Sequence, residues 1–464
     1  MNRTKAFVFI AVVWIILLLP FAGMSLWPTN TTAENTPLAE IPSGYKEGKP
    51  NLSYLSDWGA YFEDHFAFRQ QLVTANAKLY ATLFKHSTTD QVILGEDGWL
   101  YYSGTLEDYQ GENLFSERTW FALVHNLKLM QEYVESQGSR LLITVAPNKN
   151  SLYGAYMPSN YLAGTGKNID SLADRLEAAG IEYVDLYSLF QHQQEPLYFQ
   201  RDSHWNQKGA VLAYRALMEK MGKPHETYLN VPYSEKLVHM GDLDTMLYPL
   251  GAKPERDVIY ERDWNFLCPT EDYMENWIET EQPDQEGTLL MFRDSFGESL
   301  LPFLAEEFHY GYFSRLVPYH LTQIEQYRPD FVVIERVERR LFSFASEAPV
   351  MPAPQRESMT AVQVATESTV QGEMEGSYFS VRGWIDPAFL EEKSEIYVSV
   401  RDGNGVCKTY LPFYLSSPEG EGYQMYLKKE DAPAGTVHVN VIVKRQEQLA
   451  IVASAEFENK EEDL

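Results

Sequence analysis

Cysteine and positive charge are both scarce in this chain. Only two of its 464 residues are cysteines, Cys268 and Cys407, and 38 Lys and Arg stand against 66 Asp and Glu, which gives a formal net charge of −28. Two distant cysteines build neither a disulfide framework nor a cysteine-based zinc site, so we expect isolated thiols, with a single bridge between domains as the alternative. A chain this negative repels DNA, RNA and anionic membrane surfaces, and nucleic acid is therefore excluded as the leading partner.

Apolar runs long enough to cross a bilayer are limited to one, at the N-terminus. Residues 6–27 carry no charge and cover roughly the 20 apolar residues that a membrane-spanning helix needs. Arg3 and Lys5 precede this run and acidic residues follow it, which predicts the N-terminus inside the cell and the rest of the chain outside. We expect an uncleaved single-pass anchor in the cell membrane, with the bulk of the chain extracytoplasmic. A cleaved signal sequence, with a cleavage-like site at Phe21-Ala22-Gly23, is the alternative.

Residues 51–344 are predicted to fold as one α/β domain. Helical patterns alternate with short, continuous apolar runs typical of buried strands. We expect helices at 117–136, 169–179, 206–221 and 297–308, and strands at 91–94, 99–102, 140–145, 181–185, 288–292 and 330–334. Helix-like spacing also runs from 55 to 84. This alternation predicts a parallel sheet with helices on both faces.

Three further segments differ in composition from that domain. Residues 28–50 are rich in Pro, Thr, Asn and Glu and are predicted to form a spacer, and residues 345–358 shift to Ala, Pro, Ser and Glu and are predicted to form a linker. From 359 to 464 the pattern has a period of two, with turn signals such as Asp402-Gly403-Asn404-Gly405, which predicts a small β-sandwich. We expect this sandwich to bind carbohydrate or a partner protein, or simply to cover the catalytic domain.

Two short motifs carry the candidate chemistry. Asp202 and His204 lie on a predicted loop just before the helix that begins at Asn206, so both side chains can point to the same side. Such a pair can supply a general base and the carboxylate that orients it. Ser295 follows the strand that ends at Phe292, where a turn into a helix presents its hydroxyl at the carboxyl edge of the sheet and aims its amide at an oxyanion.

Each motif also has a purely structural interpretation. Asp202 or Ser203 could cap the helix that follows, and so could Asp294 or Ser295. A metal site is a further alternative, but the sequence offers no second Asp-x-His pattern to complete it, and we expect no metal. Its ligands would be Asp202, His204 and either His192 or Asp242.

The order of several motifs resembles the AlgX/AlgJ-like branch of the SGNH hydrolases and the related family named for an Asp-His-His-Trp signature. The resemblance runs from about Leu55 to Val337 and implies an SGNH-like fold with a permuted Asp…His…Ser order. The matching stations are Tyr61 to Arg69, Gly95 to Tyr101, Ala146 to Lys149, Asp202 to Asn206, Gly241 to Leu243 and Asp294 to Phe296.

This resemblance implies roles for individual residues. Ser295 would be the nucleophile, His204 the base and Asp202 the carboxylate that orients the base. Two positions depart from the family pattern: Ser203 replaces the first signature histidine, and Arg293 stands where many members have a glycine. The second departure bears on the geometry of the oxyanion hole.

Further residues are predicted to bind the oxyanion or the substrate. They are Asn148, Lys149, Arg293, Tyr153 and Trp205. Asn148 follows a strand and is the best side-chain donor for an oxyanion, although Pro147-Asn148 could simply turn the chain out of the sheet. Aromatic residues, including Trp99 and Tyr101, could stack on sugar rings, although most aromatic residues of such a chain belong to the core.

The resemblance implies an O-acetyltransferase that works outside the cytoplasm on an exported or cell-wall polysaccharide. No CoA-binding motif is present and we expect no cofactor; the resemblance instead implies a membrane partner of the MBOAT type that passes acetyl groups outward. The net charge favours a neutral or weakly charged acceptor unless a cationic groove overrides it. The alternatives are a carbohydrate esterase with the same triad and a non-catalytic glycan-binding scaffold of an export complex.

Overall fold

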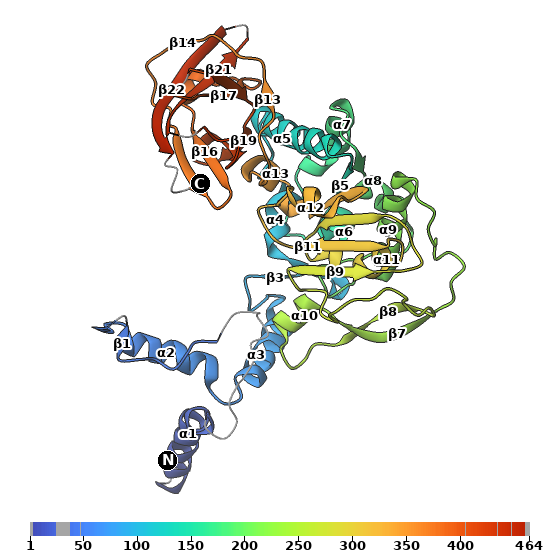
Figure 1. The fold of residues 1–464 in the computed structure, drawn as a ribbon. Helices are drawn as coiled ribbons and strands as arrows, with labels where there is room; N and C mark the ends of the chain where they lie inside the picture. Colours follow the sequence, from blue (N-terminus) through green and yellow to red (C-terminus); the bar gives the residue numbers. More distant parts are fainter. Residues whose placement is uncertain are drawn as a thin grey trace.

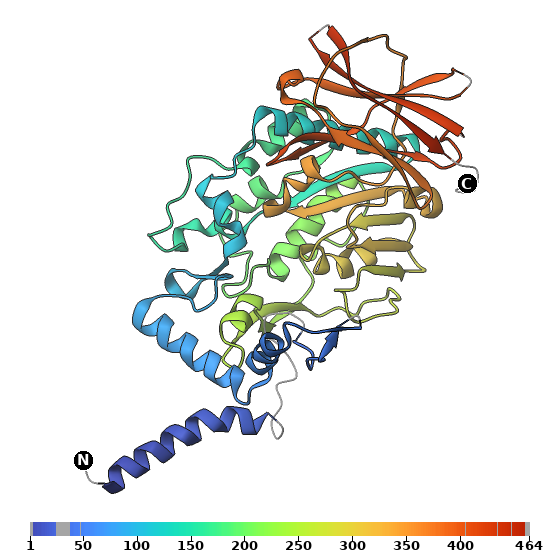
Figure 2. The ribbon, with the colours of Figure 1, turned by 90° about the vertical axis from the view of Figure 1, so that its left-hand side faces the viewer.

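The computed structural model describes residues 3–24, 38–46, 48–403, 405–433, 435–446 and 448–459. Residues 25–27 of the predicted anchor and residues 28–37 and 47 of the predicted spacer lie outside the described residues. So do Asn404 of a predicted turn and residues 434, 447 and 460–464 of the predicted sandwich. Figures 1 and 2 show the strand-rich C-terminal part at one end of the molecule and the N-terminal helix at the other.

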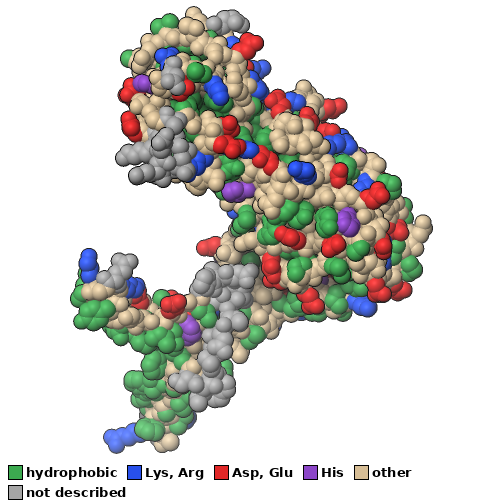
Figure 3. Space-filling view, in the orientation of Figure 1, with side chains coloured by type: hydrophobic (Ala, Val, Ile, Leu, Met, Phe, Trp, Pro, Cys, Tyr) green, Lys and Arg blue, Asp and Glu red, His purple; other side chains and the backbone are tan. Residues whose placement is uncertain are grey.

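Helix α1, Arg3–Gly23, is the one helix among the described residues that is long and apolar enough to cross a membrane. Its hydrophobic side chains are exposed and form a green surface in Figure 3. Helices α2, Tyr54–His65, and α3, Arg69–Phe84, follow it. The Ala67 amide at their junction donates a hydrogen bond of 3.0 Å to the carbonyl of Pro20. Helix α1 fits the predicted membrane anchor.

A six-stranded sheet with the order β6-β5-β12-β10-β11-β9 forms the centre of the molecule. Five of its strands are parallel, and only β9 at the edge runs antiparallel, to β11. The strands are β5 Arg140–Ala146, β6 Tyr183–Val184, β9 Trp277–Glu281, β10 Thr288–Phe292, β11 Tyr310–Ser314 and β12 Phe331–Val337. The predicted α/β class is confirmed, whereas strands β9 and β11 were not predicted.

Alternate residues of the central strands face two different hydrophobic clusters, as the two-residue period of a strand requires. Leu141 and Ile143 of β5 face one cluster, and Leu142 faces the other. The first face is covered by α5 Glu117–Ser136, α7 Asn168–Ala178 and α12 Gln323–Tyr327. The second is covered by α8 Leu186–Gln191, α9 Gln207–Met221 and α11 Leu301–Ala305. Helices therefore cover both faces, as predicted.

The helix predicted at 297–308 is present only in part, as two shorter pieces. A 3-10 turn, Phe296–Glu298, comes first, and α11 starts anew at Leu301 with Pro302 in its first turn. Proline lacks an N–H and fits only the first turn of a helix, so the helix cannot run on through it. Ser295 therefore begins a short 3-10 turn and does not lie at the N-terminus of a long helix.

Two hairpins lie beside the central sheet. Strands β3 Val92–Leu94 and β4 Leu100–Tyr102, both predicted as strands, pair antiparallel with each other. Strands β7 Tyr233–Met240 and β8 Pro254–Tyr260 form a second, unpredicted pair, and helix α10, Asp242–Leu247, follows β7 directly. The remaining short helices are α4 Leu106–Gln110, α6 Lys149–Tyr153 and α13 Ser343–Ser346.

The C-terminal part consists of two sheets, as the period-two pattern predicts. One has the order β13-β18-β17-β21-β22-β14 and the other β15-β16-β20-β19. The alternating segment 409–414 is split at Pro412 between the two sheets, because proline donates no hydrogen bond to a strand ladder. The strands are β13 Gln355–Arg356, β14 Val362–Gln363, β15 Gln371–Glu375, β16 Tyr378–Trp384, β17 Glu395–Arg401, β18 Cys407–Tyr410, β19 Phe413–Ser417, β20 Gly420–Lys428, β21 Gly435–Arg445 and β22 Gln448–Asn459.

The predicted linker at 345–358 is packed into the molecule. Met351 is fully buried, and β13 at the end of this segment pairs with β18. One hydrophobic cluster continues from α5 and the central sheet into the C-terminal strands. The division of the chain into separate domains stays a prediction. Cys268 and Cys407 are both free thiols, as expected.

Candidate active site

Ser295 lies at the carboxyl edge of the central sheet, three residues after β10 ends. The Asp294 carboxylate fixes this turn, because it accepts hydrogen bonds from the amides of Phe296 (2.9 Å) and of Val337 on the neighbouring strand end (2.8 Å). A Cβ atom at Gly297 would lie 2.6 Å from the Cβ of Arg293, so the tight turn requires glycine there. Asp294 thus fixes the turn, whereas the Ser295 side chain, at the N-cap of the 3-10 turn that follows, caps nothing.

Asp202 and His204 lie on the loop between α8 and α9, directly before the latter. Helix α9 is capped by Asn206, whose side-chain oxygen accepts a hydrogen bond of 3.1 Å from the amide of Gly209. The alternative that Asp202 or Ser203 caps this helix is therefore excluded. Asp202 is free to bind the imidazole two residues later.

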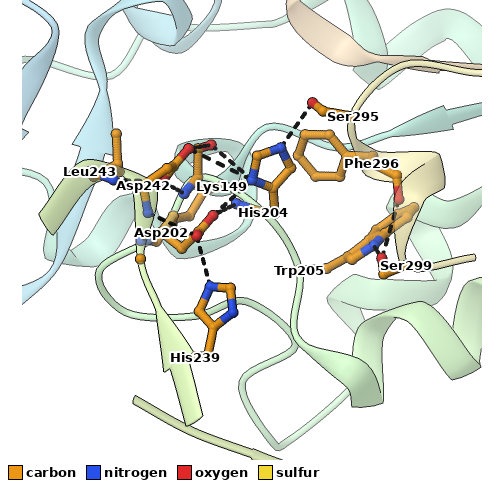
Figure 4. Close-up of polar contacts among 12 residues, drawn as sticks. Lys149, Asp202, His204, Trp205, His239, Asp242, Leu243, Ser295, Phe296 and Ser299 are labelled. Carbon is orange, nitrogen blue, oxygen red and sulfur yellow. Dashed lines mark hydrogen bonds and ion pairs between the residues drawn. The ribbon is translucent and has the colours of Figure 1, made fainter. Parts of the chain in front are cut away.

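The structure brings the three predicted catalytic residues into one hydrogen-bonded series (Figure 4). The Nε2 atom of His204 lies 2.9 Å from Oγ of Ser295, and its Nδ1 lies 2.7 Å from Oδ1 of Asp202. An ionised carboxylate can only accept, so the ring hydrogen belongs on Nδ1, and Nε2 is left to accept the serine hydroxyl proton. This arrangement has the geometry of a nucleophile, a general base and an orienting carboxylate.

Sequence reasoning missed a second histidine at the same carboxylate. His239, near the end of β7, donates from Nε2 to Oδ2 of Asp202 over 2.8 Å, and its ring stacks on Phe199 with centroids 3.6 Å apart. The Asp242 amide donates to the same oxygen over 3.0 Å. His239 stands two residues before the Gly241-Asp242-Leu243 station, so its proximity to that motif was the signal that could have found it.

Charges and hydrogen bonds shift the pKa values of these groups. Burial raises the pKa of Asp202, but the hydrogen bonds from His204 and His239 outweigh burial and hold it well below the ordinary value. Burial lowers the pKa of His204, yet the hydrogen bond and charge of Asp202, with the charge of Asp242, raise it above its ordinary value. Burial and the charge of Asp202 raise the pKa of Asp242. The site therefore favours an ionised Asp202 beside an unusually basic His204.

A pocket of about 380 Å³ opens in front of Ser295 and His204. Trp205 forms part of its wall; the ring is almost fully buried, and its Nε1 donates to Oγ of Ser299 over 2.5 Å. This burial leaves little of the Trp205 ring surface open for stacking on a sugar. The other lining residues are Phe199, Asp202, Gln207, His239, Met240, Asp242, Asp257, Tyr273, Glu298, Ser299 and Pro302.

Asn148 and Lys149 do not line this pocket. The amide side chain of Asn148 donates to Asp108 (2.8 Å) and accepts from the amide of Arg339 (3.3 Å), in a fully buried position. Both residues follow β5, and β12 separates β5 from β10, the strand that precedes Ser295. The predicted role of Asn148 as an oxyanion donor finds no support in this arrangement.

Lys149 lies outside the pocket lining and binds the loop that carries Asp202. Its Nζ donates to three backbone carbonyls, those of Leu100 (2.7 Å), Gln200 (2.7 Å) and Asp202 (2.9 Å). Burial lowers its pKa to about 7, against the raising effect of the nearby carboxylates. The structure thus gives Lys149 a place in holding the loop and none in contacting substrate.

Arg293 and Tyr153 also lie outside the pocket lining. The Arg293 side chain is buried and donates to the carbonyls of Tyr273 and Asp294, and burial lowers its pKa to about 10. The Tyr153 hydroxyl accepts from the amide of Leu197 over 2.8 Å. Trp99 and Tyr101 are buried in the core beside Tyr153, so these aromatic residues build the fold.

The same cluster offers one group of possible metal ligands among the described residues, namely Asp202, His204 and Asp242, with ligand atoms within 4.8 Å of one another. Ser203 donates to Oδ2 of Asp242 over 2.5 Å, and both nitrogens of His204 face hydrogen-bond partners. A cation there would have to replace these hydrogen bonds. His192 is remote from the group, bonded to the Ser188 carbonyl within its own helix end. We therefore assign no metal.

Comparison with known proteins agrees with the resemblance predicted from the motifs. Residues 92–256 match the family model described as SGNH hydrolase-like domain, acetyltransferase AlgX. The match includes Asp202 and His204 and ends before Ser295. A curated relative, the probable alginate O-acetylase AlgJ of Pseudomonas syringae pv. tomato, is 26% identical over 277 residues, which are 55% of this chain. The chain spans 65% of the length of that relative.

Several solved structures are also similar to this chain over about half of its length. That of Bacillus cereus PatB1 matches with a TM-score of 0.46 and 17% identity, over 55% of this chain and 100% of that one. The O-acetyltransferase domain of Pseudomonas putida AlgJ matches with a TM-score of 0.37 and 18% identity, over 54% and 92%. A DHHW family protein from Eubacterium siraeum matches with a TM-score of 0.38 and 18% identity, over 48% and 86%.

Proposed function

We propose that this chain is an O-acetyltransferase that moves an acetyl group through an acetyl-serine at Ser295 to a hydroxyl of an exported or cell-wall polysaccharide. The observation that carries the proposal is the hydrogen-bonded series from Asp202 through His204 to Ser295, open to a pocket. The match of residues 92–256 to an acetyltransferase family model supports acyl transfer as the reaction class. The alginate O-acetylase name of the curated relative supports a polysaccharide as the acceptor.

The reaction needs two acyl transfers at one serine. In the first, Nε2 of His204 takes the proton of Oγ of Ser295 while Oγ attacks the acetyl carbonyl carbon of the donor; the donor's ester bond breaks, and the leaving group takes the proton from His204. In the second, His204 takes the proton of a sugar hydroxyl, whose oxygen attacks the acetyl carbon. The bond to Ser295 breaks, and the proton returns to its Oγ. Asp202 stabilises the imidazolium that forms in each step.

The location of the chain fits a donor that comes from the membrane. Helix α1 is proposed as an uncleaved anchor that keeps the catalytic part, residues 51–344, on the extracytoplasmic side. A membrane protein of the MBOAT type is the proposed acetyl donor, because acetyl-CoA is confined to the cytoplasm. The C-terminal strands, residues 359–464, are proposed to bind glycan or this partner.

A transfer assay tests the proposal. The purified full-length protein is incubated with an activated acetyl ester, with and without a polysaccharide acceptor, and acetylated glycan and free acetate are both quantified. We expect acetylated glycan with the natural protein and loss of product with Ser295→Ala. Free acetate alone would support the esterase alternative, since the same triad can pass the acetyl group to water. An unchanged rate in Ser295→Ala would refute the nucleophile.

A further inference from the structure

We infer that the sugar unit acetylated at Ser295 is uncharged, and that Glu298 helps to exclude uronic acids from the pocket. The inference rests on the proposed function and adds the chemical class of the acceptor. Four carboxylates, those of Asp202, Asp242, Asp257 and Glu298, line the pocket, and no Lys or Arg is among its described lining residues. The only balancing groups in the lining are His204 and His239.

The carboxylates that line the pocket come from separate parts of the chain. Glu298 lies three residues after Ser295 in the same 3-10 turn, whereas Asp242 and Asp257 come from the elements around the β7–β8 hairpin. Asp202 is ionised, because the hydrogen bonds from its two histidines hold its pKa well below the ordinary value. A carboxylate on the reacting sugar would therefore meet like charges inside a pocket of the protein, where electrostatic repulsion is stronger than in bulk water.

Several Lys and Arg side chains of the catalytic part are already bound to other protein groups and do not line the pocket. Lys149 and Arg293 are buried and bonded to backbone carbonyls, and Arg201 pairs with Asp244. Lys208 belongs to an adjoining pocket of about 290 Å³ that shares Asp257 with the first, and it pairs with Glu195 at 2.6 Å.

Arg339 is a further cation near the pocket, and the experiments below test whether it could bind an anionic sugar. Its guanidinium carbon lies 5.8 Å from the ring centre of Phe296, outside the lining, and its charge acts on His204. If an anionic sugar were bound at Ser295, Arg339 is the side chain that would have to balance it.

The first experiment measures the electrostatic potential at Ser295 and needs no glycan. Three arylsulfonyl fluorides of similar size are used: one with an ammonium group, one uncharged and one with a carboxylate. In each, Oγ of Ser295 attacks sulfur, the S–F bond breaks, fluoride leaves, and His204 takes the serine proton. The second-order rate of labelling at Ser295 is divided by the hydrolysis rate of each probe in buffer, which removes differences in intrinsic reactivity.

We expect the cationic probe to label Ser295 about fivefold or more faster than the anionic probe at low salt. At about 1 M salt, where the Debye length falls to roughly 3 Å, the difference should shrink. Glu298→Gln should reduce the ratio and Glu298→Lys should reduce it further. Glu177→Gln makes the same change of net charge on an exposed face of α7 and should leave the ratio intact. Equal rates, or faster labelling by the anionic probe, would overturn the inference.

The second experiment uses one glycan with and without charge. A trigalacturonide and its methyl ester share every sugar and linkage and differ only in the carboxylates. We expect acetylation of the methyl ester to exceed that of the free acid about fivefold or more at low salt, and Glu298→Lys to narrow this preference. A preference for the free acid that disappears in Arg339→Gln would overturn the inference while leaving acyl transfer intact. Acetate release with neither glycan acetylated would contradict transfer itself, and the inference with it.

Discussion

His204 is the residue on which the pH dependence of the proposed reaction depends. Only its neutral form can take a proton from Ser295, so activity should rise with pH as the imidazolium loses its proton. Burial lowers the His204 pKa, but Asp202 and Asp242 together raise it above the ordinary value of 6.5. The rising limb of kcat/KM should therefore have its midpoint above pH 6.5.

Asp242→Asn tests this assignment. The change removes a negative charge 3.7 Å from Nδ1 of His204 and keeps a side-chain oxygen for the amide of Ser203. The imidazolium loses stabilisation, so the limb should move to lower pH. Asp174→Asn on the exposed side of α7 has the same charge change and should leave the limb in place. A limb that stays fixed or moves to higher pH in Asp242→Asn would show that another group titrates.

At this scale the sequence predicted which three residues come together better than it predicted their surroundings. Asp202 and His204 are two residues apart, and Ser295 follows a strand, so local pattern and motif order sufficed to predict their proximity, while their catalytic roles stay a proposal. Asn148 was misjudged because its position depends on the order of strands in the sheet, which a single sequence does not disclose. Buried aromatic and cationic residues such as Lys149 look in the sequence like ligand-binding residues, since burial itself is not visible there.

The β7–β8 hairpin is the element that completes the site, and it carries His239. The ring of His239 donates to Oδ2 of Asp202 and stacks on Phe199. The hairpin therefore holds one oxygen of the Asp202 carboxylate, while His204 binds the other. Period-two alternation did not reveal this hairpin, because most of its residues in β7 are exposed and no buried face sets a pattern. The edge strand β9 was missed for a different reason: of its two buried residues only Ile278 is apolar, and Glu279 and Glu281 interrupt the apolar run.

Two substitutions separate the hydrogen bond of His239 from its bulk. His239→Leu removes the donor, and we expect kcat to fall about 10- to 100-fold, the equivalent of one hydrogen bond to a charged group. His239→Gln keeps a nitrogen that can reach Oδ2 of Asp202 and should retain most of the activity. Steady-state kinetics with an acetyl ester gives kcat and KM for both. Equal losses in the two variants would contradict a positioning role through the hydrogen bond.

At the scale of the whole molecule, the C-terminal strands and the central sheet share one hydrophobic cluster. Asn126 on α5 connects them: its Nδ2 donates to the carbonyls of Phe344 and Tyr414, each over 2.8 Å, and its Oδ1 accepts from the Tyr414 amide over 2.9 Å. Composition and period-two alternation predicted the two sheets of this part. They could not predict that α5 packs on it, because such a contact joins residues almost 300 positions apart.

Asn126→Ala should destabilise both parts together. It leaves three buried backbone groups without a partner, at about 1–3 kcal/mol each, so we expect a loss of at least about 2 kcal/mol of unfolding free energy. Differential scanning calorimetry should show one transition that moves as a unit to lower temperature. Glu135→Ala at an exposed position of the same helix is the control. Two separate transitions, with only one of them shifted, would contradict a shared core.

The central claim is that the acetyl group passes through Ser295, and a pulse and chase of the acetyl-enzyme tests it most directly. The full-length protein is mixed with an activated acetyl ester and quenched, and the peptide containing Ser295 is examined by mass spectrometry; a parallel sample receives an uncharged glycan before quenching. The account predicts acetyl on Ser295 in the first sample, and its loss in the second as acetylated glycan appears at the same rate. Acetylated glycan formed while Ser295 stays unmodified, or formed equally well by Ser295→Ala, would contradict it.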